Sequence, residues 1–226
     1  MTTSSRKTED LRREKQRAQY RVHMFLGIGT FLLAMGTLVM LATGSEPTTT
    51  TTAPSNEIVV TGETLPPQIE GSLDNAIGMD APSIRATGLN GEMIEIVPGT
   101  KPIVLLFLAH WCAPCLTEVP VVQSYVDEVG IPTDIEFYTI LSSNDPEREN
   151  YPPEVWLENE GWTLPTIRDD ESESIITSYG LSGYPHLVVI DPDGTLAARA
   201  SGGMDRQGLE KLFSDLLEMI GGVGSE

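Results

Sequence analysis

Runs of apolar residues predict the buried strands of this chain. Residues 103–108 (Ile-Val-Leu-Leu-Phe-Leu) are apolar throughout, and the largely apolar stretches at 135–141 and 186–190 are two further strand candidates. Continuous apolar runs of this length are typical of central strands that are covered on both faces. We therefore predict three central strands, followed after an Asp-Pro-Asp-Gly turn by an antiparallel partner strand at 195–200.

Helical patterns alternate with these strands. Residues 116–129 predict a helix that ends at a glycine, and Pro120 inside it is expected to bend it. Two short helices are predicted at 153–160 and 172–179, and a final amphipathic helix at 207–220. The resulting order, β-α-β-α-β-β-α, predicts an α/β fold with a mixed central sheet flanked by helices.

A β-hairpin is predicted just before the first central strand. Asn90-Gly91 separates a short strand that begins near Ser83 from a return strand at 92–97. This dipeptide favours a two-residue turn of type I′. The hairpin is therefore predicted as an addition at the N-terminal side of the central sheet.

The first third of the chain has a different composition. We predict a basic cytoplasmic tail at 1–23, a transmembrane signal-anchor at 24–43 and a flexible Thr/Pro-rich spacer at 44–75, before a folded domain at 76–226. Residues 24–42 contain no charged side chain, and that length is close to what crosses a bilayer. The basic flank predicts a cytoplasmic N-terminus with the domain outside. A signal peptide cleaved near residue 44 is the alternative, and would give a secreted domain.

The charge distribution narrows the range of partners. Residues 1–23 contain seven Lys/Arg against three acids, a net charge of +4, whereas the remainder contains 30 acids and 7 bases, a net charge of −23. A domain this acidic does not bind nucleic acid through its phosphates. Neutral or basic proteins are the expected partners, and the acidity also serves solubility.

Both cysteines of the chain lie at the turn between the first central strand and the helix after it. Cys112 lies near the helix N-terminus, where unpaired N–H groups and the helix dipole stabilise a thiolate. Cys115, about one turn further on, can then resolve a mixed disulfide. A purely structural disulfide closing so short a loop would stabilise little, and the chain has no second cysteine pair for zinc. The pair therefore predicts redox chemistry.

Several motifs together resemble a known family. Trp111-Cys112-Ala113-Pro114-Cys115 matches W-C-x-P-C, Glu118 and Pro120 extend it to C-x-x-C-x-x-E-x-P, and Gly183-Tyr184-Pro185 precedes an apolar strand. Over about residues 76–221 the chain resembles thioredoxin-fold proteins, in the TlpA-like branch of membrane-tethered, extracytoplasmic thiol–disulfide oxidoreductases.

The resemblance implies roles for individual residues. Pro185 would follow a cis peptide bond and lie opposite the cysteines, so that the backbone of Tyr184 meets an extended substrate. Glu118 would exchange a proton with Cys115, and Trp111 would shield the cysteines and contact the partner. Alternatively, Glu118 is an ordinary solvated acid of the helix, and Trp111 is an aromatic residue with a purely structural role.

The chain departs from the thioredoxin pattern at three places. The strand position that is a buried acid in thioredoxin is Leu106, which leaves proton transfer to Glu118. The dipeptide between the cysteines is Ala-Pro rather than Gly-Pro, which affects the redox potential. His186 follows Pro185 and is a candidate for substrate contact or thiolate tuning, and His110 either stabilises the thiolate or points into solvent.

The predicted function is thiol–disulfide exchange with protein substrates outside the cytoplasm. The resemblance implies a reductant for cytochrome c or metal-site assembly, recharged by a membrane thiol-transfer partner, with no cofactor or metal. An oxidase that introduces disulfides into secreted proteins is the alternative. A peroxidase is disfavoured because Ala109 occupies the position of a required Thr. A copper-delivery module would have only His186 as a further ligand.

Overall fold

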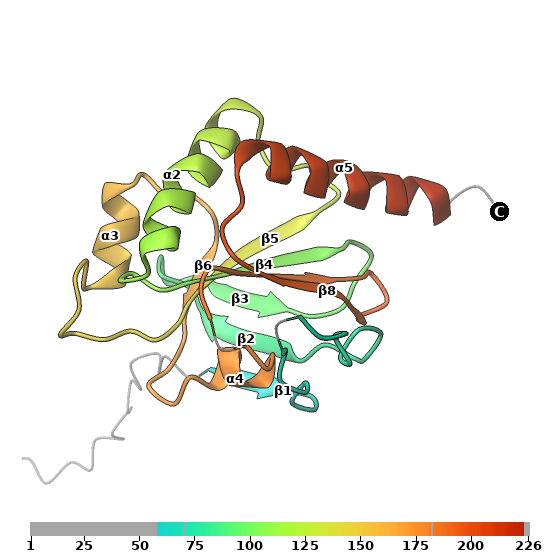
Figure 1. The fold of residues 1–226 in the computed structure, drawn as a ribbon, viewed down its shortest axis with the longest axis horizontal. Coiled ribbons are helices and arrows are strands. Elements are labelled where there is room, and N and C mark those ends of the chain that lie inside the picture. Colours follow the sequence, from blue (N-terminus) through green and yellow to red (C-terminus); the bar gives the residue numbers. More distant parts are fainter. Residues whose placement is uncertain (1–57, 70, 182, 224–226) are drawn as a thin grey trace, which may run out of the picture. The chain divides into compact units, whose positions relative to one another are not determined.

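The computed structural model describes residues 58–69, 71–181 and 183–223 (Figure 1). The predicted tail at 1–23, the signal-anchor at 24–43 and the first part of the spacer lie outside these residues. Within the described part of the chain, no helix combines the length and the apolar character needed to span a membrane.

A five-stranded mixed sheet forms the centre of the domain. Its strands lie in the order β6-β5-β4-β7-β8. Strands β4, β5 and β6 are parallel to one another, whereas β7 is antiparallel to β4 and β8 is antiparallel to β7. The bounds are β4 Ile103–Leu108, β5 Glu136–Leu141, β6 Thr166–Arg168, β7 His186–Ile190 and β8 Leu196–Ser201. The predicted α/β class and the mixed central sheet are therefore confirmed.

Helices cover both faces of this sheet. Helices α2 (Ala113–Glu128) and α5 (Arg206–Val223) pack on one face, with α3 (Pro153–Asn159) beside α2 (Figure 1). Helix α4 (Ser174–Ser178) lies on the other face. Helix α2 contains Pro120, as predicted, and the bend expected at this proline stays a prediction.

The added N-terminal strands form a separate three-stranded antiparallel sheet. It contains β1 (Val59–Thr61), β2 (Ser83–Thr87) and β3 (Met93–Ile96), in that order. The hairpin between β2 and β3 is confirmed, but its turn is not of type I′. In the turn only Gly91 has a positive φ, and the Gly88 and Glu92 backbones pair around a three-residue loop. This is a type I turn followed by a glycine bulge.

Part of the predicted spacer belongs to the folded domain. Besides β1, Leu65 is 1% exposed, and its N–H donates to the Ser178 carbonyl at 2.8 Å. The buried Arg199 guanidinium pairs with Asp74 and donates to the Pro66 carbonyl. The folded domain therefore begins at or before residue 58, and the boundary predicted at 76 is too late. Side-chain contacts from distant segments order a stretch whose composition suggested a linker.

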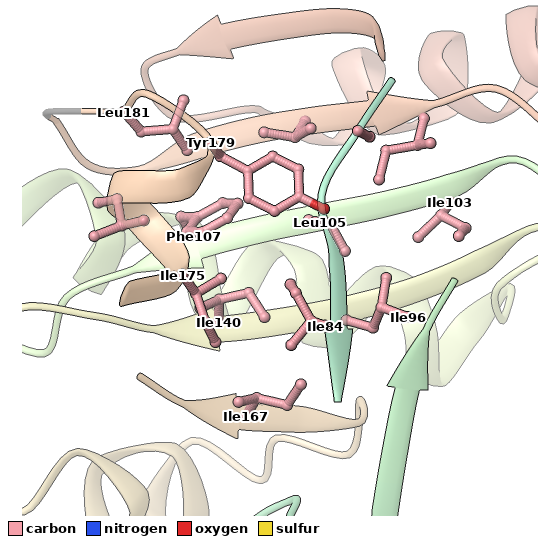
Figure 2. Close-up of a cluster of buried hydrophobic side chains, with 14 of the residues drawn as sticks. Ile84, Ile96, Ile103, Leu105, Phe107, Ile140, Ile167, Ile175, Tyr179 and Leu181 are labelled. Atoms are coloured by element: carbon pink, nitrogen blue, oxygen red, sulfur yellow. The ribbon is translucent and has the colours of Figure 1, made fainter. Parts of the chain in front are cut away.

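Two hydrophobic clusters lie on opposite faces of the central sheet. Alternate residues of β4 belong to different clusters: Ile103, Leu105 and Phe107 face α4 and the small sheet, whereas the residues between them face α2 and α5. Figure 2 shows the first cluster, where the Tyr179 ring packs against Phe107 with ring centroids 5.7 Å apart. This alternation decides which side chains can reach the cysteines.

Candidate active site

Cys112 lies at the N-cap of α2, directly after the turn that leaves β4. Its Sγ accepts a hydrogen bond from the Cys115 backbone N–H at 3.3 Å, one of the donors that a helix N-terminus leaves unpaired. Both cysteines are reduced and buried, with Cys112 6% and Cys115 0% exposed. The sulfur that is slightly accessible is thus the one that receives a helix N–H.

Cys115 is surrounded on all sides. Burial raises the pKa of its thiol well above the ordinary value, and a hydrogen bond with Cys112 and the charge of Glu118 raise the pKa further. Cys115 is therefore a neutral thiol at physiological pH and needs a base before it can act as a nucleophile.

Glu118 shares a helix face with Cys115, as its spacing predicted. The side chain is 4% exposed, and burial raises its pKa to about 7, although the Met204 N–H donates to Oε1 at 2.7 Å. Within the described residues Oε2 has no hydrogen-bond partner. Glu118 is therefore a buried carboxyl group that changes protonation near neutral pH, on the helix face that holds Cys115.

Pro185 closes the site from the side of the sheet. The Tyr184–Pro185 peptide bond is cis, as predicted. The loop after β8 lies between Pro185 and α2, since a Cβ placed on Gly203 would be 3.9 Å from Pro185 Cγ and 4.0 Å from Glu118 Cβ. Pro185 and Glu118 are thus brought together with the cysteine turn.

Trp111 is held by an aromatic and polar network. Its Nε1 donates to the Ser143 carbonyl at 2.8 Å, and its ring meets that of Tyr184 edge-on with centroids 6.0 Å apart. The Tyr184 hydroxyl and Ser143 Oγ are 2.8 Å apart. The guanidinium of Arg148 lies 4.6 Å from the centroid of the Trp111 ring. Trp111 and Tyr184 therefore form one edge of the site.

His110 has a role that the sequence did not suggest. The side chain is fully buried, and its Nδ1 donates to the Glu149 carbonyl at 2.6 Å, whereas Nε2 accepts the Asp145 N–H at 3.2 Å. These two partners require a neutral ring with the proton on Nδ1. Asn150 Nδ2 donates to the His110 carbonyl at 3.0 Å. His110 therefore fastens loop 142–152 instead of facing the thiolate or solvent.

His186 does not lie with the cysteines. Along β7, Leu187 and Val189 belong to the cluster that contains the cysteines, whereas Val188 and Ile190 belong to the other. Alternation places His186 on that other face, near Arg199. Burial lowers its pKa to about 4, with a further contribution from the Arg199 charge. The structure thus separates His186 from the group formed by Trp111, Tyr184, Pro185 and Glu118.

Two chemical alternatives can be compared with this geometry. Ala109, where peroxidatic enzymes of this fold have a Thr, is fully buried and has no hydroxyl. In the part of the chain that the structure describes, no three His, Cys, Asp or Glu side chains group as a metal site would require. The one histidine proposed as a copper ligand, His186, is on the opposite face of the sheet.

Two groups that shape the site could not be predicted from the sequence. The Met204 N–H is a backbone donor, which any residue except proline could supply. Ser143 adopts a φ of +51° and contacts Trp111, Tyr184 and Glu173. Its position depends on how loop 142–152 folds back, which no local pattern encodes. Asn and Pro residues in the loop indicated only that it was irregular.

The chain is similar in sequence to a thiol-disulfide oxidoreductase and to nucleoredoxin. The chain is 29% identical over 136 residues to the thiol-disulfide oxidoreductase ResA of Bacillus anthracis, covering 59% of this chain and 75% of ResA. It is 33% identical over 121 residues to nucleoredoxin of Bos taurus, covering 52% of this chain but only 24% of that protein. The predicted resemblance to thiol–disulfide oxidoreductases is confirmed.

A solved structure and a family profile agree with the fold. A thiol:disulfide interchange protein of the thioredoxin family from Chlorobium tepidum superposes with a TM-score of 0.50 at 20% identity, covering 63% of this chain and 99% of that one. The profile of the AhpC/TSA family matches residues 77–199, more than half of the sequence. The chain therefore belongs to the AhpC/TSA family.

Proposed function

We propose that this protein exchanges thiols and disulfides with protein substrates through Cys112 and Cys115, and that it acts as a reductant. The observation that carries the proposal is the position of Cys112 at the N-cap of α2, with its Sγ 3.3 Å from the Cys115 N–H. The activity of the ResA relatives supports it.

The first step forms a mixed disulfide. The Cys112 thiolate attacks one sulfur of a substrate disulfide, the substrate S–S bond breaks, and the other sulfur leaves as a thiolate that takes a proton from water. The Cys115 N–H stabilises the attacking thiolate, because it donates to Sγ before the reaction begins.

The second step releases the substrate. Cys115 loses its proton to the Glu118 carboxylate and attacks Cys112 Sγ, so that the mixed disulfide breaks and the second substrate sulfur leaves as a thiolate. Two electrons have then passed to the substrate, and Cys112 and Cys115 are joined by a disulfide. Glu118 suits this role because its pKa of about 7 lets it accept a proton near neutral pH.

The surroundings of Cys112 favour the reducing direction. A strongly stabilised thiolate makes a cysteine pair oxidising, because it stabilises the reduced state. Here Ala113 and Pro114 have no side-chain donor, and both ring nitrogens of His110 are engaged by loop 142–152. Among the described residues, the hydrogen-bond donor to Cys112 Sγ is therefore the helix N-terminus, through the Cys115 N–H.

The proposal extends to the place of action. The apolar run at 24–42 and the basic residues before it support a membrane-anchored protein with its redox domain outside the cytoplasm. Cytochrome c or metal-site assembly proteins are the proposed substrates. A membrane thiol-transfer partner would restore the reduced pair with two electrons and two protons.

The reduction potential of the cysteine pair tests the direction. Equilibration of the full-length protein with glutathione mixtures, read by alkylation and mass spectrometry, should give a value near the roughly −270 mV of thioredoxin. A value near about −120 mV, typical of the strong oxidase DsbA, would contradict the reductant and support the oxidase. The variant Cys112→Ser should show no such equilibrium.

A further inference from the structure

A cavity of about 650 Å³ lies directly beside the cysteine turn. Its wall includes Trp111, the residue before Cys112, together with Tyr151 and Arg148 from the loop that His110 fastens. It is also lined by residues 168–171 and Glu173, from the end of β6 and the connection to α4. A substrate whose disulfide has reached Cys112 would therefore place its flanking residues next to this cavity.

The cavity has an excess of carboxylates. Its two cations are already compensated, since Arg148 pairs with Asp145 at 3.5 Å and Arg168 pairs with Glu154 at 3.0 Å. The remaining acids are Asp169, Asp170, Glu171 and Glu173. Within the described part of the chain, none of these four has a cationic group within salt-bridge distance.

These carboxylates differ in their availability. Asp169 is buried and accepts hydrogen bonds from Ser142 and from backbone N–H groups, so it is part of the frame. Glu171 is exposed, and Glu173 accepts one hydrogen bond, from Ser143 Oγ at 2.5 Å. The two glutamates are therefore the acids that a ligand can meet without disturbing the fold.

The aromatic walls of the cavity already hold guanidinium groups. Arg148 lies 4.6 Å from the centroid of the Trp111 ring and Arg168 lies 5.6 Å from that of Tyr151. Because an aromatic face attracts a cation, these contacts show that the cavity suits a guanidinium or ammonium group. Arg148 is largely exposed at this wall, with a side-chain exposure of 57%, so an incoming cation can take its place.

We propose that this cavity is a recognition site for a basic side chain, Arg or Lys, of a polypeptide segment that flanks the substrate cysteines. The inference rests on the proposed function, since it names the class of substrate. Aromatic walls supply the contact with the cation, and Glu171 and Glu173 supply the opposite charge. The same two glutamates disfavour acidic segments at this place, because like charges repel.

The test compares three peptides that differ only in the residues beside their disulfide. The probes carry two Arg, two Gln or two Glu at these positions, and each is mixed with the reduced full-length protein in detergent. The second-order rate constant of single-turnover exchange is followed by tryptophan fluorescence. We expect the Arg peptide to react roughly tenfold faster than the Glu peptide, as for a few charge pairs at a binding rim.

Two double variants separate the cavity from the overall charge of the protein. Glu171→Gln/Glu173→Gln should remove most of the preference for the Arg peptide, measured as the ratio of its rate constant to that of the Gln peptide. Glu160→Gln/Glu218→Gln removes the same charge from exposed positions outside the cavity and should keep the preference.

Three results would overturn the inference. An equal rate for all three peptides would show that the cavity does not discriminate. An equal loss of preference in both double variants would assign the preference to the overall charge of the protein. If no peptide reacts with the wild-type protein, the proposed function itself fails, which is a different result from exchange without a preference.

Discussion

Glu118 and His186 are both ionisable and nearly fully buried, yet they lie on opposite faces of the central sheet. Within the described residues, each has a buried side-chain atom without a hydrogen-bond partner. Burial favours the neutral form of each: it raises the pKa of Glu118 to about 7 and lowers that of His186 to about 4. Their exposed fractions are similar, but only Glu118 is on the face of the cysteines.

The contrast shows that burial alone does not make a side chain functional. Glu118 changes protonation near neutral pH on the face that holds Cys115, so its proton can be used in exchange. His186 is neutral over the same range, and after burial the charge of Arg199 contributes most to its lowered pKa. Substitution of these two residues therefore gives four measurements that separate the effect of position from the effect of burial.

The largest expected effect is on the second step of exchange. Glu118→Gln keeps an acceptor for the Met204 N–H but cannot take the Cys115 proton, so release of substrate from the mixed disulfide should slow by roughly 100-fold. The wild-type rate should rise with pH through about 7 as Glu118 ionises, and the variant should lack this inflection. Stopped-flow measurement of the released thiol from pH 5 to 9 tests both.

Asp127→Asn is the matched control for this experiment, because Asp127 is an exposed acid on the same helix. It should keep both the rate and the inflection. An inflection that persists in Glu118→Gln would assign the titration to another group and remove Glu118 from the mechanism.

The next effect is on stability at high pH. Glu118 has a pKa of about 7 in the folded state against 4.5 for the ordinary side chain, so the stability that is present below 4.5 is lost as the pH rises through 7. The free energy of unfolding of Glu118→Gln, relative to that of the wild type, should therefore rise by on the order of 2 kcal/mol between pH 4.5 and pH 8. Urea denaturation of the reduced protein at both pH values measures this. A pH-independent difference would contradict the raised pKa.

An effect of opposite sign is expected at His186. Its pKa is about 4 in the folded state against 6.5 ordinarily, so stability is lost as the pH falls from 6.5 toward 4. His186→Leu should remove this loss, so its free energy of unfolding relative to wild type should rise by on the order of 2 kcal/mol between pH 7 and pH 4.5. Thermal unfolding at the two pH values is the measurement, and an unchanged acid slope would count against a buried neutral imidazole.

The smallest effect is that of His186→Leu on exchange. Because the ring lies on the face away from the cysteines, the second-order rate constant at pH 7 should change by less than about twofold, within the range of a distant neutral substitution. A larger loss, with folding intact by circular dichroism, would place His186 back among the residues that contact substrate or tune the thiolate.

The sequence alone predicted the regular parts of this fold well, because their patterns are local. The apolar run 103–108, the helix with Pro120 and the Asn90-Gly91 turn each marked an element that the structure contains. The alternation of side chains along a strand also predicts that His186 lies on the face away from Pro185. Pro185 and His186 are consecutive at the start of a strand, so their side chains had to face opposite ways.

The parts that were missed depend on contacts between distant segments. Residues 58–75 looked like a linker, yet Leu65 packs into the core and Arg199 binds Asp74 across more than a hundred residues. Likewise, the buried His110 is satisfied by backbone groups of loop 142–152. Such contacts appear only once the chain has folded, so no local pattern predicts them.

The most direct test of thiol–disulfide exchange is to trap its intermediate. With Cys115→Ser, the full-length protein should form a stable mixed disulfide with a disulfide-containing polypeptide, and mass spectrometry should place the bond at Cys112. Cys112→Ser should form none, because buried Cys115 is a neutral thiol without access to substrate. If Cys115→Ser accumulates no mixed disulfide, or if the bond is found in Cys112→Ser instead, Cys112 is not the nucleophile and the account is contradicted.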